Sequence, residues 1–346
     1  MRRNDRARFS TAFPALFAGA SLLLAALAAP VASAGSCPET ERTVRFGFYA
    51  YFEPVSHSAQ PDPAAPGFDD HRGYEADLLT AMEAMEGVNL SFLRRGVAAW
   101  EDIWLLPAGP DYDLAGGGIT VLDTRTRDAA GKRAVVFTAG HIRFRQSLLV
   151  RAEDAKRLSR YEDLDSAVRV GVIAGTTGEA RLLELTGLAD AQGVLAAGVR
   201  IDTPRGTAVA DGSAGYRIAA AGASPALDGR LRLHPPTPAM PQVIYMEDEA
   251  ALIGALLAGE IDALARGDIG NRHAARAHRG ALAIGAVDER AETGGFAVAA
   301  DAAALAACLD EAIAWLTDHG RIGYRDWLDD PGVFLRRART WKGGER

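Results

Sequence analysis

Apolar runs of strand length alternate with helical stretches along most of this chain, and this alternation restricts the folds that it can adopt. The runs "TVRFGFYAY" (43–51) and "VRVGVIAG" (168–175) have the length and apolar character of buried strands. The stretches "EADLLTAMEAM" (75–85) and "EDEAALIGALLAG" (247–259) repeat their apolar residues at helical spacing. Strands that alternate with helices predict an α/β fold with a mostly parallel sheet.

Residues 189–242 interrupt this alternation. They are rich in Gly, Pro and Ala and contain only weak strand signals. A segment of this length without clear periodicity is either a decorative insertion or a functional loop. The sequence leaves both interpretations open.

The first 34 residues predict export. A basic start, "MRRNDRAR", precedes an apolar core, "ALFAGASLLLAALAA", and "VASA" ends at Ala34 like a cleavage site. This order is typical of a secretory signal peptide, and the alternative is an uncleaved membrane anchor. The rest of the chain is long enough for about two domains. We therefore expect a periplasmic protein.

The charge balance argues against nucleic acid as a partner. The chain carries 38 Lys and Arg against 45 Asp and Glu, which gives a formal net charge of −7. An acidic surface repels phosphate backbones, and no polybasic stretch indicates docking on anionic lipid.

The chain has 2 cysteines, Cys37 and Cys308. They do not make a disulfide framework, so we expect the core to rest on apolar burial. We interpret Cys308, in "AALAACLDEAIAWL", as a small buried hydrophobe. Cys37 lies close to the cleavage site, where lipid attachment is an alternative, although "AGSC" lacks the Leu expected three residues before a lipidated Cys.

The sequence carries few signals of catalysis or metal binding. It contains no H-E-x-x-H, no phosphate loop that ends in G-K-[ST] and no G-x-S-x-G. His273 and His278 would lie about 140° apart on a helix, which does not suit a metal pair. We therefore expect no catalytic residue, metal or cofactor, and we favour a binding protein.

The stretch "DLAGGGITVLDTR" (113–125) brings glycines, a hydroxyl and a guanidinium together. Taken alone, it is typical of a strand end followed by a glycine turn and a solvated Arg. It also has the parts of an anion site. Glycines let backbone N–H groups approach a ligand, and a planar guanidinium grips a carboxylate through two hydrogen bonds.

Several segments, in order along residues 43–337, resemble the family 3 periplasmic solute-binding proteins, the amino-acid receptors of ABC importers. They are "VRFGFYAYFEPV", "GYEADLL", "WEDIWLLPAGPDYDLAGGGIT", "EDLDSAVRVGVIAGTTGE", "LLAGEIDALARGD" and "GGFAVAADAAALAACLDEAIAWLTDHGRIGYRDWL". The resemblance implies a monomer that holds a small ligand between two α/β lobes and presents it to an ABC permease.

The same resemblance implies the boundaries of the lobes. Lobe 1 is expected to comprise 43–150 and 292–337, and lobe 2 to comprise 151–291, with the insertion at about 189–242. The strand crossings that join the lobes are expected near 148–152 and 290–296.

In lobe 1, the resemblance assigns ligand-binding roles around the glycine turn. Arg125 falls at the family's Arg, which holds the ligand's α-carboxylate, with Thr120 and Gly118 at the turn before it. A register shifted by two residues would select Arg127 instead. Phe52 matches the aromatic residue of the family's opening turn and is expected to cover the ligand, with a place in the core as the alternative.

In lobe 2, the resemblance places Thr177 toward the ligand at a helix start, where unpaired N–H groups favour an anion, while Thr176 caps the helix. The family's ammonium-binding Asp corresponds to Gly267 here. Asp268 therefore either replaces it or is a solvated helix cap. Trp100, from lobe 1, is a further ligand-contact candidate, or a packing residue beneath the cleft.

Two other functions stay open. Periplasmic dehydratases of the cyclohexadienyl type look similar, but they carry an N-P-G-G-T-N-like turn where this chain has "IAGTTG". A ligand-sensing module for a membrane partner is the other, with 189–242 as its docking surface. The sequence does not name the ligand, and an amino acid or related organic acid is the expected class.

Overall fold

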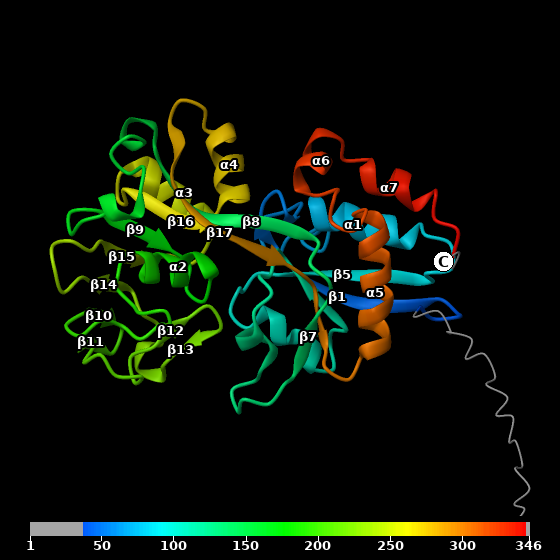
Figure 1. Cartoon of the computed structure of the whole chain (residues 1–346), viewed down its shortest axis with the longest axis horizontal. Coiled ribbons are helices and arrows are strands. Elements are labelled where there is room, and N and C mark those ends of the chain that lie inside the picture. Colours follow the sequence, from blue (N-terminus) through cyan, green and yellow to red (C-terminus); the bar gives the residue numbers. More distant parts are fainter. Residues whose placement is uncertain (1–36, 344–346) are drawn as a thin grey trace, which may run out of the picture. The chain divides into compact units, whose positions relative to one another are not determined.

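Two sheets flanked by helices organise the chain (Figure 1). The computed structural model describes residues 37–343, so the predicted signal peptide lies outside the described residues. The α/β class expected from the sequence is confirmed. The expectation of a mostly parallel sheet is wrong, because antiparallel strand pairs outnumber parallel ones in the two main sheets.

Lobe 1 is built on a five-stranded sheet. Its strands are β1 (Arg42–Tyr49), β5 (Leu90–Val97), β6 (Leu114–Gly116), β7 (Val135–Phe137) and β18 (Ala297–Ala299). They lie in the order β5-β1-β6-β18-β7, with β1 parallel to both of its neighbours. The remaining elements are α1 (Tyr74–Glu83), α5 (Ala303–Leu316), α6 (Tyr324–Asp329), α7 (Val333–Ala338), η1 (Ile103–Ala108), η2 (Asp123–Thr126), β2 (Tyr51–Phe52), β3 (Ser56–Ser58) and β4 (His71–Arg72).

Lobe 2 is built on an eight-stranded sheet of order β11-β10-β14-β15-β9-β16-β8-β17. These strands are β8 (Ile142–Arg151), β9 (Arg169–Val172), β10 (Arg200–Thr203), β11 (Gly206–Val209), β14 (Arg232–His234), β15 (Gln242–Tyr245), β16 (Ala263–Gly267) and β17 (Leu282–Gly294). The other elements are α2 (Thr177–Leu185), α3 (Glu249–Ala258), α4 (Asp268–Ala277), η3 (Ala152–Asp154), η4 (Tyr161–Asp163), η5 (Pro225–Leu227), β12 (Ile218–Ala219) and β13 (Gly222–Ala223).

The core of lobe 1 explains the first apolar run of the sequence. Val44, Phe46 and Phe48 of β1 are fully buried. They belong to a cluster that also takes in α1 and α5, for example through Leu78 and Leu309. Each such side chain stabilises the fold by about 1.5–3 kcal/mol relative to exposure, so this strand is fixed by burial.

The chain passes between the two sheets twice. The first passage lies at residues 138–141, between β7 and β8, and the second at 295–296, between β17 and β18. Strand β8 pairs along its length with β17 and with β16, so it belongs to lobe 2. The first passage therefore precedes the expected 148–152.

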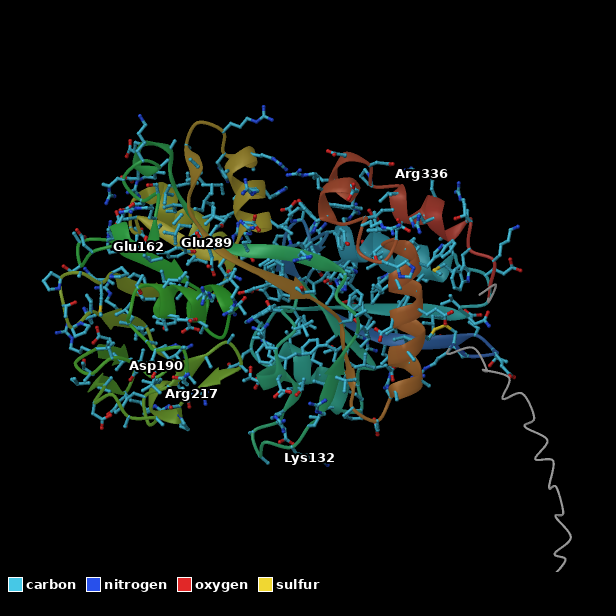
Figure 2. The ribbon with its side chains drawn as sticks, viewed as in Figure 1. Lys132, Glu162, Asp190, Arg217, Glu289 and Arg336 are labelled. Atoms are coloured by element: carbon cyan, nitrogen blue, oxygen red, sulfur yellow. A yellow bond between two sulfur atoms is a disulfide. The ribbon has the colours of Figure 1, made fainter. Side chains whose placement is uncertain are left out.

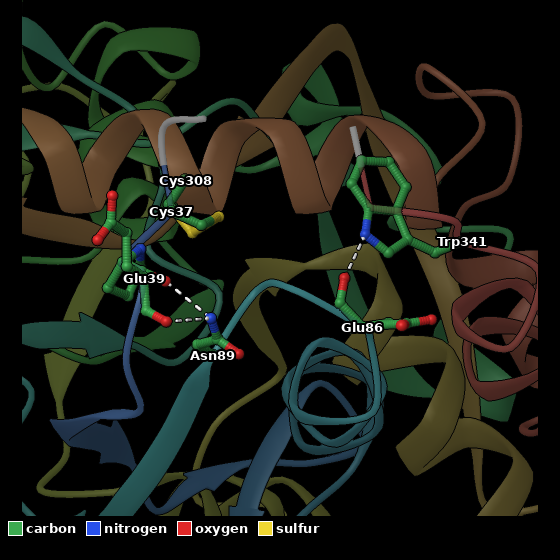
Figure 3. Close-up of a disulfide and its surroundings, with 7 residues drawn as sticks. Cys37, Glu39, Glu86, Asn89, Cys308 and Trp341 are labelled. Atoms are coloured by element: carbon green, nitrogen blue, oxygen red, sulfur yellow. Dashed lines mark hydrogen bonds between the residues drawn. A yellow bond between two sulfur atoms is a disulfide. The ribbon is translucent and has the colours of Figure 1, made fainter. Parts of the chain in front are cut away.

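A disulfide joins Cys37 to Cys308 on α5, across 271 residues of sequence (Figure 3). The interpretation of Cys308 as a free buried hydrophobe is therefore wrong, although the residue is fully buried. Two cysteines so far apart in sequence give no local signal that they meet. Because the Cys37 sulfur is bonded to Cys308, it is not available for a thioether to lipid.

The segment 189–242 contains strands that its composition did not predict. Strands β10, β11 and β14 extend the eight-stranded sheet at its edge, and β12 and β13 form a separate hairpin. These strands are two to four residues long, too short to show a period in the sequence. In Figure 1 they lie at the lower left, below β15.

Candidate functional site

A cavity of about 60 Å³ lies where the strand ends of the two lobes meet. Lobe 1 contributes Tyr49, Phe52, Trp100, Gly118 and Thr120, and lobe 2 contributes Phe144, Gln146, Ile173, Thr176, Thr177, Gly178, Glu249, Leu252, Ala265, Arg266 and Gly267. Most of these residues lie at or just after the carboxyl ends of β1, β6, β9 and β16, where open α/β sheets bind ligands, while Phe144 and Gln146 lie on β8 and Glu249 and Leu252 on α3. Five of the sequence-predicted residues, Phe52, Trp100, Gly118, Thr120 and Thr177, lie in this wall.

Four polar side chains, which we call the hinge cluster, form a hydrogen-bonded group beside the cavity. They are Thr120, Gln146, Thr177 and Glu292. Glu292 does not line the cavity wall, whereas the other three do. Gln146 Nε2 donates to Thr177 Oγ1 and to Glu292 Oε2, both over 2.9 Å. The hydroxyls of Thr120 and Thr177 lie 3.2 Å apart, and Thr120 donates to Glu292 Oε2 over 3.3 Å. Since Thr120 belongs to lobe 1 and the others to lobe 2, the cluster joins the lobes.

Aromatic rings form the apolar part of the wall. Tyr49 and Trp100 pack edge to face with ring centroids 5.1 Å apart. Phe52 lies so close to Gly118 that a Cβ there would come within 2.6 Å of its ring. Gly118 also has a φ of 69°, so the backbone and the neighbouring ring both require glycine. The glycine turn is thus needed for close packing at the cavity.

An ion pair inside lobe 2 reaches the cavity. Arg266, near the end of β16, donates to the carboxylate of Glu249 on α3, and the two side chains are only 10% and 13% exposed. Arg266 also donates from Nε to Asn271 Oδ1 over 2.8 Å and from Nη2 to the backbone oxygen of Gly270 over 2.9 Å. Burial raises the pKa of Glu249 to about 7, although the charge of Arg266 opposes that shift. Arg266 is the cation in the described cavity wall.

Arg125 lies beside the cavity and is not part of its wall. The side chain is fully buried, and its guanidinium lies 4.4 Å from the ring centroid of Trp104 and 5.4 Å from that of Trp100. Its hydrogen bonds go to three backbone oxygens, those of Thr120 (3.3 Å), Gly175 (3.1 Å) and Ala220 (3.0 Å). These oxygens come from both lobes, so Arg125 bridges the lobes. Its predicted hold on a ligand carboxylate stays a prediction, since the three backbone oxygens use three of its five N–H groups.

Asp268 and Arg127 also lie outside the wall. Asp268 begins α4, where its carboxylate accepts hydrogen bonds from the backbone N–H of Arg145 over 3.0 Å and from Arg272 Nε over 3.3 Å. Arg127 is exposed and pairs with Asp123 at 3.5 Å. Asp268 therefore links β8 to α4. It is not the solvated helix cap that was one of the two expectations for it, because the N-cap residue of α4 is Gly267 and no side chain caps the helix.

Thr176 and Thr177, at the start of α2, have different roles. Thr176 Oγ1 accepts a hydrogen bond from the backbone N–H of Glu179 over 3.1 Å, as a helix cap does. Thr177 contributes to the cavity wall and to the hinge cluster. The cap on Thr176 agrees with the sequence-based interpretation.

Sequence reasoning missed four polar residues of this site: Gln146, Glu249, Arg266 and Glu292. Arg266 interrupts a strand that is otherwise apolar, and a charged residue near the end of a buried strand was a usable signal. Gln146 lies in β8 among other polar residues, so it does not stand out. Glu249 begins a helix, where acids are ordinary, and Glu292 follows other charged residues, so neither stands out.

Among residues 37–343, no group of three or more His, Cys, Asp or Glu side chains is arranged to hold a metal ion. Nor does this part of the chain contain a helix that is long and apolar enough to cross a membrane.

Comparison with known sequences gives one short match. No protein-family profile matches the chain. A probable histidine-binding protein of Neisseria gonorrhoeae is 26% identical over 115 residues, or 33% of this chain. That match spans only 39% of the length of the relative.

Solved structures match over most of the chain. An amino-acid ABC transporter substrate-binding protein of Streptococcus pneumoniae, bound to L-arginine, is 15% identical with a TM-score of 0.55, covering 86% of this chain and 95% of that one. An ancestral amino-acid-binding protein, a precursor of cyclohexadienyl dehydratase, is 18% identical with a TM-score of 0.52 and the same coverage. Holo ArgBP of T. maritima is 17% identical with a TM-score of 0.51, covering 84% and 95%. The two-lobed fold implied by the sequence resemblance is thereby confirmed.

Proposed function

We propose that this protein captures an amino acid or a related small carboxylate between its lobes, outside the cytoplasm, and delivers it to an ABC importer. The observation that carries the proposal is the cavity between the lobes, with hydroxyls of Thr120 and Thr177 meeting across it at 3.2 Å. A ligand bonded to both lobes stabilises their closed arrangement selectively. The likeness to solved amino-acid-binding proteins points to the same class of ligand.

The anionic end of the ligand is assigned to Arg266. Arg266 lies in the cavity wall, and its three described hydrogen bonds use three of the five N–H groups of a guanidinium. The remaining N–H groups are free to grip a carboxylate. Gly118, Phe52 and Trp100 surround the rest of the ligand in this proposal.

The lobes must separate for a ligand to enter. The lobes already touch beside the cavity, where the hydroxyls of Thr120 and Thr177 lie 3.2 Å apart. Binding should therefore proceed through an open form that closes on the ligand.

Calorimetric titration with the common L-amino acids tests the proposal directly. We expect at least one of them to bind, and Arg266→Met to weaken it about 10- to 100-fold, as loss of a charged hydrogen bond does. Arg272→Met, an exposed arginine on α4, is the matched control and should leave binding unchanged. Failure of every amino acid and small organic acid to bind would reject the proposal.

A dehydratase is the second candidate, because one structural neighbour is a precursor of cyclohexadienyl dehydratase. That neighbour is itself an amino-acid-binding protein. Incubation with prephenate and arogenate separates the two functions, since product absorbance would appear with an enzyme only. We expect none.

A further inference from the structure

Two buried oxygens in the hinge cluster have no hydrogen-bond partner among the described residues. They are Gln146 Oε1 and Glu292 Oε1. Gln146 is 2% exposed and Glu292 is 5% exposed. A buried polar atom without a partner costs about 1–3 kcal/mol, so two in one cluster require an explanation.

The side chains of the hinge cluster donate their hydrogen bonds to one another. Gln146 gives both amide hydrogens away, to Thr177 and to Glu292. Thr120 gives its hydroxyl hydrogen to the Glu292 carboxylate, so the contact between the threonines requires Thr177 to donate to Thr120. Every hydrogen that these side chains can donate is thus used within the cluster.

Only oxygen lone pairs of the cluster remain available to accept hydrogen bonds from a ligand. Gln146 Oε1 and Glu292 Oε1 are unused, and each threonine oxygen, which already accepts one hydrogen bond, has a second lone pair. Such a surface repels a carboxylate and attracts a group that donates hydrogen bonds and accepts none. An ammonium has three N–H donors and no acceptor, which matches it.

The charge of Glu292 also lacks a direct counter-ion. No Arg, Lys or His nitrogen among residues 37–343 lies within 4.0 Å of its carboxylate. Burial lowers the pKa of Arg125 to about 9, and the nearby Glu292 charge opposes that shift only in part. The hydrogen bonds of Arg125 go to backbone oxygens and not to Glu292. A buried carboxylate is stabilised by a paired cation, and a ligand ammonium would supply one.

We propose that Glu292 and Gln146, from the two paired strands β17 and β8, form an ammonium subsite, in which Gln146 lines the cavity wall and Glu292 is hydrogen-bonded to the lining residues Gln146 and Thr120. The inference rests on the proposed function, because it assigns one end of the proposed ligand. It also accounts for Gly267 on β16, which stands where an acidic partner was expected, because the acid is now on β17, on the other side of β8 in the sheet. The ligand would then lie with its ammonium at the hinge cluster and its carboxylate at Arg266.

The test measures binding of three matched sets of probes by calorimetry. They are the L-amino acids, the same compounds without the α-amino group, and the same compounds without the carboxyl group. Glu292→Gln keeps the shape and removes the charge, and Gln146→Met removes the unpaired amide oxygen. Glu289→Gln is the control, since Glu289 is an exposed residue on β17 (Figure 2).

We expect E292Q to weaken the best amino acid about 10- to 100-fold and to leave its desamino counterpart unchanged. Q146M should also weaken binding of the amino acid and leave its desamino counterpart unchanged. This variant provides the test if E292Q does not fold. E289Q should bind like the wild type. Equal losses for the amino acid and its desamino counterpart, or no loss in E292Q, would overturn the subsite.

The remaining outcomes separate this inference from the proposed function. Binding of desamino acids alone would overturn the subsite and leave the capture of a small carboxylate intact. Binding of amines alone, weakened in E292Q, would uphold the subsite and reject a carboxylate ligand. If no probe of any set binds, both proposals fail.

Discussion

At the scale of the residue, Glu249 should make the stability of the fold depend on pH. Its pKa is raised from 4.5 to about 7, mainly by burial, so the folded protein holds this proton more tightly than the unfolded chain does. The free energy of unfolding should therefore fall as the pH rises from about 4.5 through 7, by up to about 3 kcal/mol.

Urea unfolding at pH 5 and pH 8 measures this difference in stability. Glu249→Gln should flatten the dependence, because glutamine has no proton to lose. A wild-type protein that becomes more stable over this interval would contradict the role of Glu249.

Arg125 makes a second prediction at this scale. Arg125→Met removes the hydrogen bonds to Thr120, Gly175 and Ala220 and leaves their oxygens unpaired. We expect a loss of about 3–5 kcal/mol of stability, as when one side of a buried charged contact is removed. Chemical denaturation measures it, and ligand affinity at a temperature where the variant is folded should change less than in Arg266→Met.

At the scale of the element, the insertion supports the start of α2. Arg230, within the insertion, donates to both oxygens of the fully buried Glu179 carboxylate, at 2.7 and 2.9 Å. Glu179 in turn accepts from the backbone N–H of Gly175 and from the hydroxyl of Tyr245, both over 2.7 Å. The insertion is therefore not decorative, because it helps fix the turn that leads into Thr177.

Replacing Arg230 should show how much its ion pair with Glu179 contributes to the free energy of unfolding. Arg230→Met leaves Glu179 buried without its cation and should cost about 3–5 kcal/mol. Adding Glu179→Gln should recover part of the loss, since the buried charge is then gone. Arg217→Met, an exposed arginine of the same insertion (Figure 2), should change the unfolding midpoint little.

Much of the element order was predictable, because burial imposes apolar runs on β1, β9 and α5. The fold class followed from those patterns and the family resemblance, and five of the seven candidate site residues lie in the cavity wall, where their contact with a ligand stays a prediction. The strands of 189–242 were not predictable, since they are short and held by partners distant in sequence. The hydrogen-bond partners of Arg125 were not predictable either, because they are backbone oxygens, which any sequence supplies.

At the scale of the whole molecule, the disulfide should contribute measurably to stability. A bond that closes a loop of 271 residues restricts the unfolded chain strongly, and loss of a native disulfide costs about 2–5 kcal/mol. Adding a reductant should lower the urea midpoint of the wild type by a corresponding amount. A variant with both Cys37→Ala and Cys308→Ala should not respond to reductant, and a wild type equally indifferent to it would contradict this contribution.

The position of this disulfide also sets an order of events during synthesis. Cys308 is synthesised 271 residues after Cys37. The sequence holds no other cysteine, so Cys37 has no partner within it until Cys308 has been added. The thiol is then open to capture by other thiols, and oxidation of the mature protein reports that chain synthesis has passed residue 308.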